Sequence, residues 1–162
     1  MHPVLIVQLL ALLCLANGAP LIAKKLFGTA FTTPVDRGIT LADGKPLFGR
    51  SKTFRGIAFA FAMTTFGAPI AGVSRLMGLV VSAAAMSGDL LSSFLKRRLG
   101  LVPGSMALGV DQIPESLLPA IAARWFLPLT ILDIAFVTVL FLAFELLASR
   151  VLFALNIRDR PY

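Results

Sequence analysis

Cysteine and histidine are scarce in this sequence, and the shortage excludes several kinds of site. Its 162 residues include one cysteine, Cys14, and one histidine, His2. A single cysteine cannot form an intramolecular disulfide or a multi-cysteine metal site, and we expect no chemical role for a histidine at the chain start. A Ser/His/Asp or Cys/His catalytic site is therefore not indicated. We expect Cys14, which lies in an apolar run, to face lipid or to pack against another helix.

Charged residues are also few, at 14% of the chain, whereas 57% of the residues are hydrophobic and the mean hydropathy is +0.88. This composition is typical of an integral membrane protein and excludes an ordinary soluble domain. The net charge of +7 is not arranged as a basic stripe with interleaved aromatic residues, so we expect no nucleic-acid partner. We predict a single membrane-embedded domain over residues 1–162.

Five apolar segments reach or approach the length of about 20 residues that crosses the hydrocarbon core. The predicted helices cover residues 3–23, 56–73, 76–95, 113–127 and 128–153, with cytoplasmic loops at 24–55 and 96–112. The fourth segment is short and contains Pro114, Pro119 and Arg124, which favours a tilted, broken or partly inserted helix. The predicted fold is an all-α integral membrane protein with about five transmembrane helices and two functional cytoplasmic loops.

Lysine and arginine are distributed unevenly, and this predicts the orientation. Most lie on one predicted side: seven in residues 24–55, three in 96–98, and Arg150, Arg158 and Arg160. Only Arg75 and Arg124 fall at or near the opposite helix ends. The positive-inside rule then places the N-terminus outside and the C-terminus in the cytoplasm. Because no basic residue precedes the first apolar run, we interpret it as a retained helix and not a signal peptide.

Asp89 is an acid inside the apolar segment 76–95. On a helix, residues three, four and seven positions apart share one face. The residues that share the face of Asp89 are Ser92, Ser93 and Lys96, with Arg97 close beside them. An ionised acid deep in a membrane normally faces a partner, a cavity or an ion. A structural salt bridge or a helix-capping role is the alternative interpretation.

A second acid, Asp111, stands where the second loop meets the fourth helix. It is either a helix N-cap or, with Asp89, part of an oxygen-ligand site suited to Mg²⁺. Lys52, Thr53 and Arg55 lie just before the second helix, whose N-terminus attracts anions; positive-inside anchoring is the alternative. These features together predict transfer between a water-soluble polyphosphate and a lipid phosphate, by charge neutralisation and in-line positioning.

Several motifs occur in an order that carries a family resemblance. They are ANGAP (16–20), PVDRG (34–38), DGKPLFG (43–49), KTFRG (52–56), GDLLSSFLKRRLG (88–100), DQ (111–112) and the C-terminal NIRDRPY. In these motifs the chain resembles the archaeal CDP-archaeol synthase family, CTP:lipid-phosphate cytidylyltransferases related to the bacterial CDP-diacylglycerol synthases. The resemblance implies five spanning helices, Mg²⁺ dependence, and attack of an archaetidic-acid-like or phosphatidic-acid-like lipid phosphate on the α-phosphorus of CTP. The products would be a CDP-activated lipid for phospholipid biosynthesis and pyrophosphate.

The resemblance also implies roles for individual residues. Asp89 and Asp111 would hold Mg²⁺ and, with Lys52, form the catalytic set. The residues implied to bind the phosphates or to place the substrates are Thr53, Arg55, Lys96, Arg97, Asn17, Asp36 and Ser93. The chain departs from the family pattern at Arg50-Ser51, where an acidic or small residue is common, and at Pro114-Glu115, where an acid usually follows the DQ pair sooner.

Three other functions would each require features that can be compared with the residues of this chain. CDP-alcohol phosphotransferases need spaced aspartates on neighbouring helical turns, which the six aspartates of this chain do not provide. A small transporter subunit would need ionisable residues near the midplane of several helices. Only Asp133 and Glu145 in the last helix are further candidates, and both are compatible with structural ion pairs. A catalytically inactive homologue that acts as a scaffold stays open because of the departures at Arg50 and Pro114.

Overall fold

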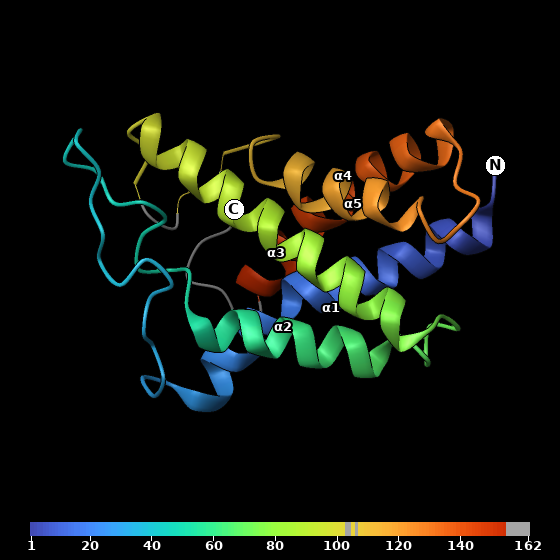
Figure 1. The fold of residues 1–162 in the computed structure, drawn as a ribbon, viewed down its shortest axis with the longest axis horizontal. Coiled ribbons are helices and arrows are strands. Elements are labelled where there is room, and N and C mark those ends of the chain that lie inside the picture. Colours follow the sequence, from blue (N-terminus) through green and yellow to red (C-terminus); the bar gives the residue numbers. More distant parts are fainter. Residues whose placement is uncertain (103–104, 106, 155–162) are drawn as a thin grey trace.

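Five α-helices and their connecting loops form the fold (Figure 1). The structure, a computed structural model, describes residues 1–102, 105 and 107–154. The helices are α1 (Pro3–Phe27), α2 (Phe54–Gly67), α3 (Arg75–Arg98), α4 (Gln112–Ala123) and α5 (Ile131–Ala154). Within the described residues there is no β-strand, so the predicted all-α class is confirmed. The C-terminal NIRDRPY motif, with Arg158 and Arg160, lies outside the described residues.

Three of the helices are long and apolar enough to cross a membrane. These are Pro3–Phe27, Arg75–Arg98 and Ile131–Val151, with hydropathies of 2.1, 1.5 and 2.4. The helices α2 and α4 have 14 and 12 residues. At a rise of 1.5 Å per residue they are roughly 21 and 18 Å long, shorter than a hydrocarbon core of about 30 Å. The number of helices therefore agrees with the prediction, while α2 and α4 are shorter than the predicted segments 56–73 and 113–127.

Local signals explain where the helix ends differ from the prediction. The Thr53 hydroxyl caps α2 by accepting a hydrogen bond from the Gly56 N–H at 3.2 Å, so α2 begins at Phe54. Residues 68–73, predicted to be helical, form turns in which Gly72 has a φ of +78°. In contrast, α3 continues through residues 96–98, which were predicted to begin the second loop. Cations are favoured in a last helical turn because they oppose the negative end of the helix dipole.

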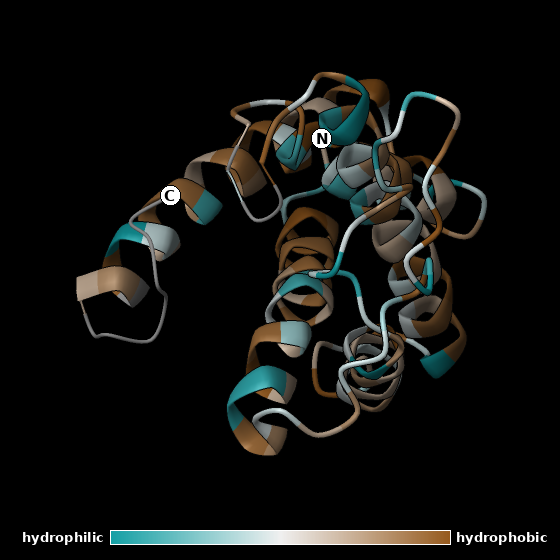
Figure 2. Cartoon of the chain, turned by 90° about the vertical axis from the view of Figure 1, so that its left-hand side faces the viewer, coloured by the Kyte–Doolittle hydropathy of each residue, from teal (hydrophilic) through white to brown (hydrophobic). Residues whose placement is uncertain are grey.

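The helix α1 lies at the centre of the bundle and packs against each of the other four helices (Figure 1). Leu12 and Leu13 of α1 are fully buried, together with Val81 of α3 and Phe141 of α5. Hydrophobic residues run along the helices, whereas hydrophilic residues gather at helix ends and in loops (Figure 2). Cys14 is half-buried, in agreement with the expected packing or lipid-facing position.

Asp133 ties the start of α5 to the start of the chain. Its buried carboxylate accepts hydrogen bonds from the His2 backbone N–H at 2.8 Å and from Thr130 N–H and hydroxyl groups at 2.9 and 2.8 Å. The His2 ring nitrogen Nδ1 lies 2.9 Å from Asp133 Oδ2, the oxygen that also accepts from Thr130. Asp133 therefore has a structural role, as one interpretation of the sequence allowed, and His2 takes part in the same contact.

Candidate functional site

The first loop is folded back on itself, and this places Lys52 beside α3. The Val35 N–H donates to the Lys52 carbonyl at 2.8 Å, and the Phe54 N–H donates to the Thr33 carbonyl at 3.2 Å. The two ends of the loop are therefore joined as they approach α2. The Lys52 side chain projects from this junction and donates a hydrogen bond to the Asp89 carboxylate of α3.

The tip of the same loop is fastened to the end of α3. The Arg98 guanidinium contacts both carboxylate oxygens of Asp43 at 2.7 Å and donates to the Pro46 carbonyl at 2.7 Å. In return, the Lys45 ammonium donates to the Arg98 carbonyl at 3.0 Å. The loop that carries Lys52 and the helix that carries Asp89 are thus connected at two separate points.

The polar face predicted for α3 is buried against other helices and loops. Ser92 and Ser93 are 0% and 2% exposed, and Lys96 and Arg97 are 7% and 3% exposed. Positively charged side chains are rarely buried to this extent without a partner. The shared polar face predicted from helical spacing is therefore confirmed. The hydrogen-bond donors of its two cations, Lys96 and Arg97, require acceptors from the protein or from a ligand.

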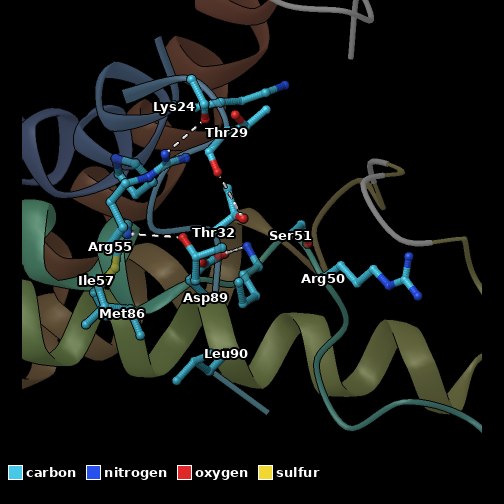
Figure 3. A pocket seen from close by; sticks show the side chains of 15 residues that line it. Lys24, Thr29, Thr32, Arg50, Ser51, Arg55, Ile57, Met86, Asp89 and Leu90 are labelled. Atoms are coloured by element: carbon cyan, nitrogen blue, oxygen red, sulfur yellow. Dashed lines mark hydrogen bonds and ion pairs between the residues drawn. The ribbon is translucent and has the colours of Figure 1, made fainter. Parts of the chain in front are cut away.

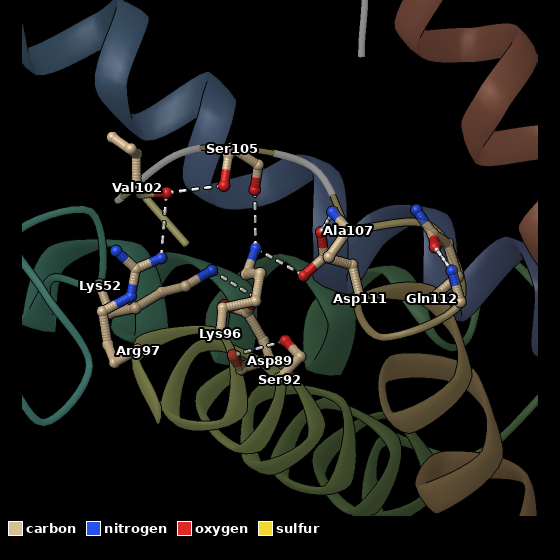
Figure 4. A network of polar contacts seen from close by, with 11 residues as sticks. Lys52, Asp89, Ser92, Lys96, Arg97, Val102, Ser105, Ala107, Asp111 and Gln112 are labelled. Atoms are coloured by element: carbon tan, nitrogen blue, oxygen red, sulfur yellow. Dashed lines mark hydrogen bonds and ion pairs between the residues drawn. The ribbon is translucent and has the colours of Figure 1, made fainter. Parts of the chain in front are cut away.

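Asp111 provides the acceptor for Lys96 (Figure 4). The Lys96 ammonium lies 2.6 Å from the Asp111 carboxylate and also donates to the Ser105 carbonyl at 3.0 Å. Asp111 stands at the N-cap position of α4, but its side chain does not cap the helix; it accepts instead from the Ala107 N–H at 2.9 Å. The N-cap interpretation is therefore wrong, and Asp111 faces α3.

The Arg97 guanidinium has hydrogen-bond donors that lack an acceptor among the described residues. Its guanidinium donates to the Val102 carbonyl at 3.1 Å, but its Nε and Nη1 groups are buried and have no hydrogen-bond acceptor among the described residues. An unpaired buried donor costs roughly 1–3 kcal/mol, and more when it is charged. Arg97 is thus prepared to accept an anion, and a phosphate group would satisfy its free donors.

These side chains converge on a polar cavity of about 200 Å³. The chemically active side chains that line it are Asn17, Lys52, Asp89, Ser93, Lys96, Arg97, Asp111, Glu115 and Glu145. The cavity brings together α1, the first loop, α3, α4 and α5. It collects seven of the ten site residues expected from the sequence, including both proposed metal ligands.

Glu115 and Glu145 are the two lining acids that sequence reasoning did not place in the site. In the sequence Glu115 marks a departure from the family pattern, and Glu145 is compatible with a structural ion pair. In the structure the Glu115 side chain lines the polar cavity together with Asp89. Asp89 itself is paired with the Lys52 ammonium. The cavity therefore places a further acid from α4 in the lining that Asp89 and Lys52 share.

A second, cationic cavity of about 400 Å³ lies on the other side of Asp89 (Figure 3). Its polar lining residues are Lys24, Thr29, Thr32, Arg50, Ser51, Lys52, Thr53, Arg55 and Asp89, and apolar residues complete the wall. Arg55 is held by the backbone carbonyls of Gly28 and Ala30. The Arg50 side chain extends away from Asp89 in Figure 3, so this departure from the family pattern places its charge at a distance from Asp89.

Lys52 and Asp89 belong to the lining of both cavities, together with Pro20, Ser51 and Met86. Burial lowers the pKa of the Lys52 ammonium, but the Asp89 carboxylate beside it outweighs this effect, and the Lys52 pKa lies above the ordinary value. Lys52 is therefore a protonated cation at neutral pH. The wall between the cavities thus carries one fixed positive charge and one carboxylate.

Comparison with known proteins identifies the family. The family model described as CarS-like CDP-archaeol synthase matches residues 4–76 and 64–162. A CDP-archaeol synthase from Sulfolobus acidocaldarius is 35% identical over 136 residues, which is 80% of this chain and 83% of that protein. The chain belongs to the CDP-archaeol synthase family. A second relative with this name, from Sulfurisphaera tokodaii, is 32% identical over 140 residues, covering 80% of this chain and 82% of its own.

A solved structure extends this family assignment to the fold. It is an intramembrane enzyme for archaeal membrane lipid biosynthesis, and it superposes with a TM-score of 0.71 at 26% sequence identity. The match covers 85% of this chain and 90% of that chain. The resemblance to CDP-archaeol synthases seen in the sequence motifs is therefore confirmed, and so is the membrane-embedded helical architecture.

The carboxylates in the polar cavity of this CDP-archaeol synthase homologue are suited to a magnesium ion whose remaining ligands come from substrate. The described residues include no cluster of three or more potential protein ligands. Mg²⁺ commonly uses only one or two carboxylates and takes its remaining ligands from waters and substrate phosphates. Asp89 and Asp111 line one cavity and belong to this chemical class. Each is paired with a lysine, so binding of a divalent cation would have to loosen these ion pairs.

Asp36 is a site residue that the structure does not bring to either cavity. Its carboxylate is 3% exposed and accepts hydrogen bonds from the N–H groups of Gly38, Phe48 and Gly49 at 3.0, 3.0 and 2.7 Å. These bonds close the hairpin of residues 36–49. Asp36 therefore has a structural role in the hairpin, because all donors around it come from its own loop, and its implied role in placing or supporting the nucleotide stays a prediction.

Asp36→Asn is expected to destabilise this hairpin by about 1–3 kcal/mol at neutral pH, because buried N–H groups lose a charged acceptor. Burial raises the pKa of Asp36, but the three backbone donors outweigh it, and the pKa lies below the ordinary value. The stabilisation is therefore present above about pH 4 and is lost as the pH falls through the folded-state pKa. Thermal unfolding midpoints of wild type and variant should differ at pH 7 and converge in acid.

Asp43→Asn is the matched control for this measurement. Asp43 lies in the same hairpin and is ion-paired with Arg98, but its side chain is 41% exposed. Exposed ion pairs contribute roughly 0–1 kcal/mol. A loss at Asp43 as large as that at Asp36 would contradict the assignment of Asp36 as the residue that closes the hairpin.

Proposed function

We propose that this protein transfers the CMP group of CTP to a lipid phosphate and releases pyrophosphate. Membership in the CDP-archaeol synthase family supports the reaction class. The observation that carries the proposal is the Lys52–Asp89 pair, which lies in the wall shared by the two cavities, each of which contains lysine and arginine side chains. Two phosphate-bearing substrates that occupy the two cavities would meet at this wall.

The reaction needs positioning and charge neutralisation more than a covalent nucleophile. An oxygen of the lipid phosphate attacks the α-phosphorus of CTP, the bond from the α-phosphorus to the α,β-bridging oxygen breaks, and pyrophosphate leaves with that oxygen. Lys52 would stabilise negative charge that builds up on the transferred group. Lys96 and Arg97 on one side, and Thr53 and Arg55 on the other, would hold the remaining phosphates.

Asn17 and Ser93 complete the polar lining and would position substrate or its ligands. Asp89 and Asp111 would hold a magnesium ion. When bound, the ion would neutralise phosphate charge and thereby support transfer. Glu115, which lines the same cavity as Asp89, would help to orient it.

We propose that the lipid substrate is archaetidic-acid-like or phosphatidic-acid-like and that the site opens to the cytoplasm. The orientation rests on lysine and arginine, which concentrate in residues 24–55 and 96–98 at the same end of the molecule as the two cavities. In this orientation the N-terminus and the His2–Asp133 contact lie outside. CTP would then arrive from the cytoplasm and the lipid from the bilayer.

Pyrophosphate release tests the proposal. Purified protein in detergent is supplied with Mg²⁺ and CTP, and with a phosphatidic acid, an unsaturated isoprenoid diether phosphate, or no lipid. We expect release that requires CTP and one lipid phosphate and that stops when the divalent cation is chelated. Silence with both lipids, from protein shown to be folded, would reject the enzymatic proposal and favour the scaffold alternative.

A further inference from the structure

We propose that Gly88 is a positioning residue for this reaction: its lack of a side chain sets the separation of α3 and α4, and with it the spacing of the carboxylates in the polar cavity. This inference rests on the proposed function and deepens it. It concerns a residue that contacts no substrate itself. Its effect is transmitted through the backbone of α4.

The contact at Gly88 is unusually close. A Cβ atom added there would lie 2.3 Å from the Pro114 carbonyl oxygen, 2.6 Å from the Pro114 carbonyl carbon and 2.9 Å from the Glu115 Cα. All three are backbone atoms, which cannot rotate away as the end of a side chain can. Any side chain at this position must therefore push the first turn of α4 away from α3.

The displaced segment carries one acid of the polar cavity, Glu115, and directly follows another, Asp111. An ordinary contact begins at 3.4 Å, so relieving the 2.3 Å approach requires a shift of about 1 Å. Gly88 directly precedes Asp89, which lines the same cavity from α3. Asp111 is paired with Lys96 of α3 at 2.6 Å. A shift of α4 would thus stretch the Lys96–Asp111 pair and move Glu115 away from Asp89.

A displacement of this size matters for chemistry. Misplacement of reacting groups by 1 Å can reduce the rate about 100-fold. The cationic cavity is built from α1, the first loop and α2, with α3 as its remaining wall, so a shift of α4 does not act on Lys24 or Arg55 directly. Gly88→Ala is therefore expected to lower kcat about 100-fold, with smaller changes in KM.

Gly78 offers a matched control on the same helix. An added Cβ there would lie 2.5 Å from the Thr64 carbonyl oxygen, 2.9 Å from the Thr65 Cα and 2.8 Å from the Ala68 Cβ. The contact is comparably tight, but it separates α3 from α2 at a point ten residues, or about 15 Å, away from Gly88 along the helix. Gly78→Ala should cost stability without changing the spacing of the carboxylates.

The experiment compares wild type, Gly88→Ala and Gly78→Ala as purified full-length proteins in detergent. Thermal unfolding midpoints are measured alone, with CTP, and with CTP plus Mg²⁺; kcat and KM are measured with both lipid phosphates. We expect both variants to unfold at lower temperature. Only Gly88→Ala should lose most of the additional Mg²⁺-dependent rise in the midpoint and about 100-fold in kcat.

Equal losses of kcat and of the Mg²⁺ response in the two variants would overturn the inference, since both glycines would then be merely structural. A wild-type protein without activity would reject the proposed function. The Mg²⁺-dependent rise in the unfolding midpoint could still be compared between Gly88→Ala and Gly78→Ala. If Gly88→Ala does not survive detergent extraction, both variants are assayed in expression membranes, normalised to the folded protein by fluorescence size-exclusion chromatography. The same contrast is expected there, and equal activities would again overturn the inference.

Discussion

Asp89→Asn is expected to reduce kcat at least about 1,000-fold, which corresponds to roughly 4 kcal/mol of lost transition-state stabilisation. The substitution keeps the shape of the side chain and one oxygen for the Lys52 ammonium. It removes the negative charge that we assign to the magnesium site. Steady-state kinetics with CTP and the preferred lipid phosphate measure the loss, and size-exclusion chromatography shows whether the variant is folded.

Asp43→Asn is the control that separates charge from location. It also removes one aspartate from an ion pair with a cation, but Asp43 lines neither cavity. We expect near-normal kcat for this variant. Near-normal turnover of Asp89→Asn would reject the metal role and leave the carboxylate with a structural salt bridge, the alternative that the sequence also allowed.

Lys52→Ala is expected to lower kcat/KM about 100- to 1,000-fold, because Lys52 is the one cation among the described residues that lines both cavities. The raised pKa of Lys52 means that the wild-type side chain is cationic throughout the neutral range. Insertion into the membrane should be unchanged. Kinetics over a range of CTP concentrations, with the amount of inserted protein measured in parallel, give the effect.

Lys45→Ala tests whether Lys52 matters through its site or only through membrane topology. Both variants lower the positive charge of the first loop by one, but Lys45 contacts the Arg98 carbonyl and does not line either cavity. Lys45→Ala should retain most of the activity. Equal kinetics for Lys52→Ala and wild type would assign the basic segment to topology alone.

The helices and the polar face of α3 could be predicted because they depend on local spacing. Apolar runs define the five helices, and the spacing from Asp89 to Lys96 defines one face, which the structure shows to be buried. The lengths of the helices were less predictable. Turns around Gly72 follow the early end of α2. The basic residues 96–98, which were expected to begin a cytoplasmic loop, instead form the last turn of α3.

The contributions of α4 and α5 to the site depend on packing that no local pattern reveals. Glu145 lies in an almost uniformly apolar helix, and its approach to the polar cavity follows from how α5 packs on α1 and α4. Glu115 reaches Asp89 because Gly88 admits the α4 backbone. The glycine beside Asp89 was visible in the sequence, but the α4 backbone that packs against this glycine was not.

Asp36 shows a different limit, because the structure gives this motif position a role in folding that the motif itself did not indicate. Its sequence context, Asp36-Arg37-Gly38, is a turn signal as well as a motif. The three backbone donors that meet its carboxylate include two from residues 48 and 49, more than ten positions away. Only the closed hairpin reveals these contacts of the Asp36 carboxylate.

The transfer of labelled phosphorus tests the central claim most directly. Two reactions are run with the purified protein, Mg²⁺ and the preferred lipid phosphate, one with CTP labelled at the α-phosphorus and one with CTP labelled at the γ-phosphorus. We expect the α-label to move into the lipid phase and the γ-label to appear as pyrophosphate in the aqueous phase. Retention of the α-label in the aqueous phase, with folded protein and either lipid, would contradict the assignment of this site as a lipid-phosphate cytidylyltransferase.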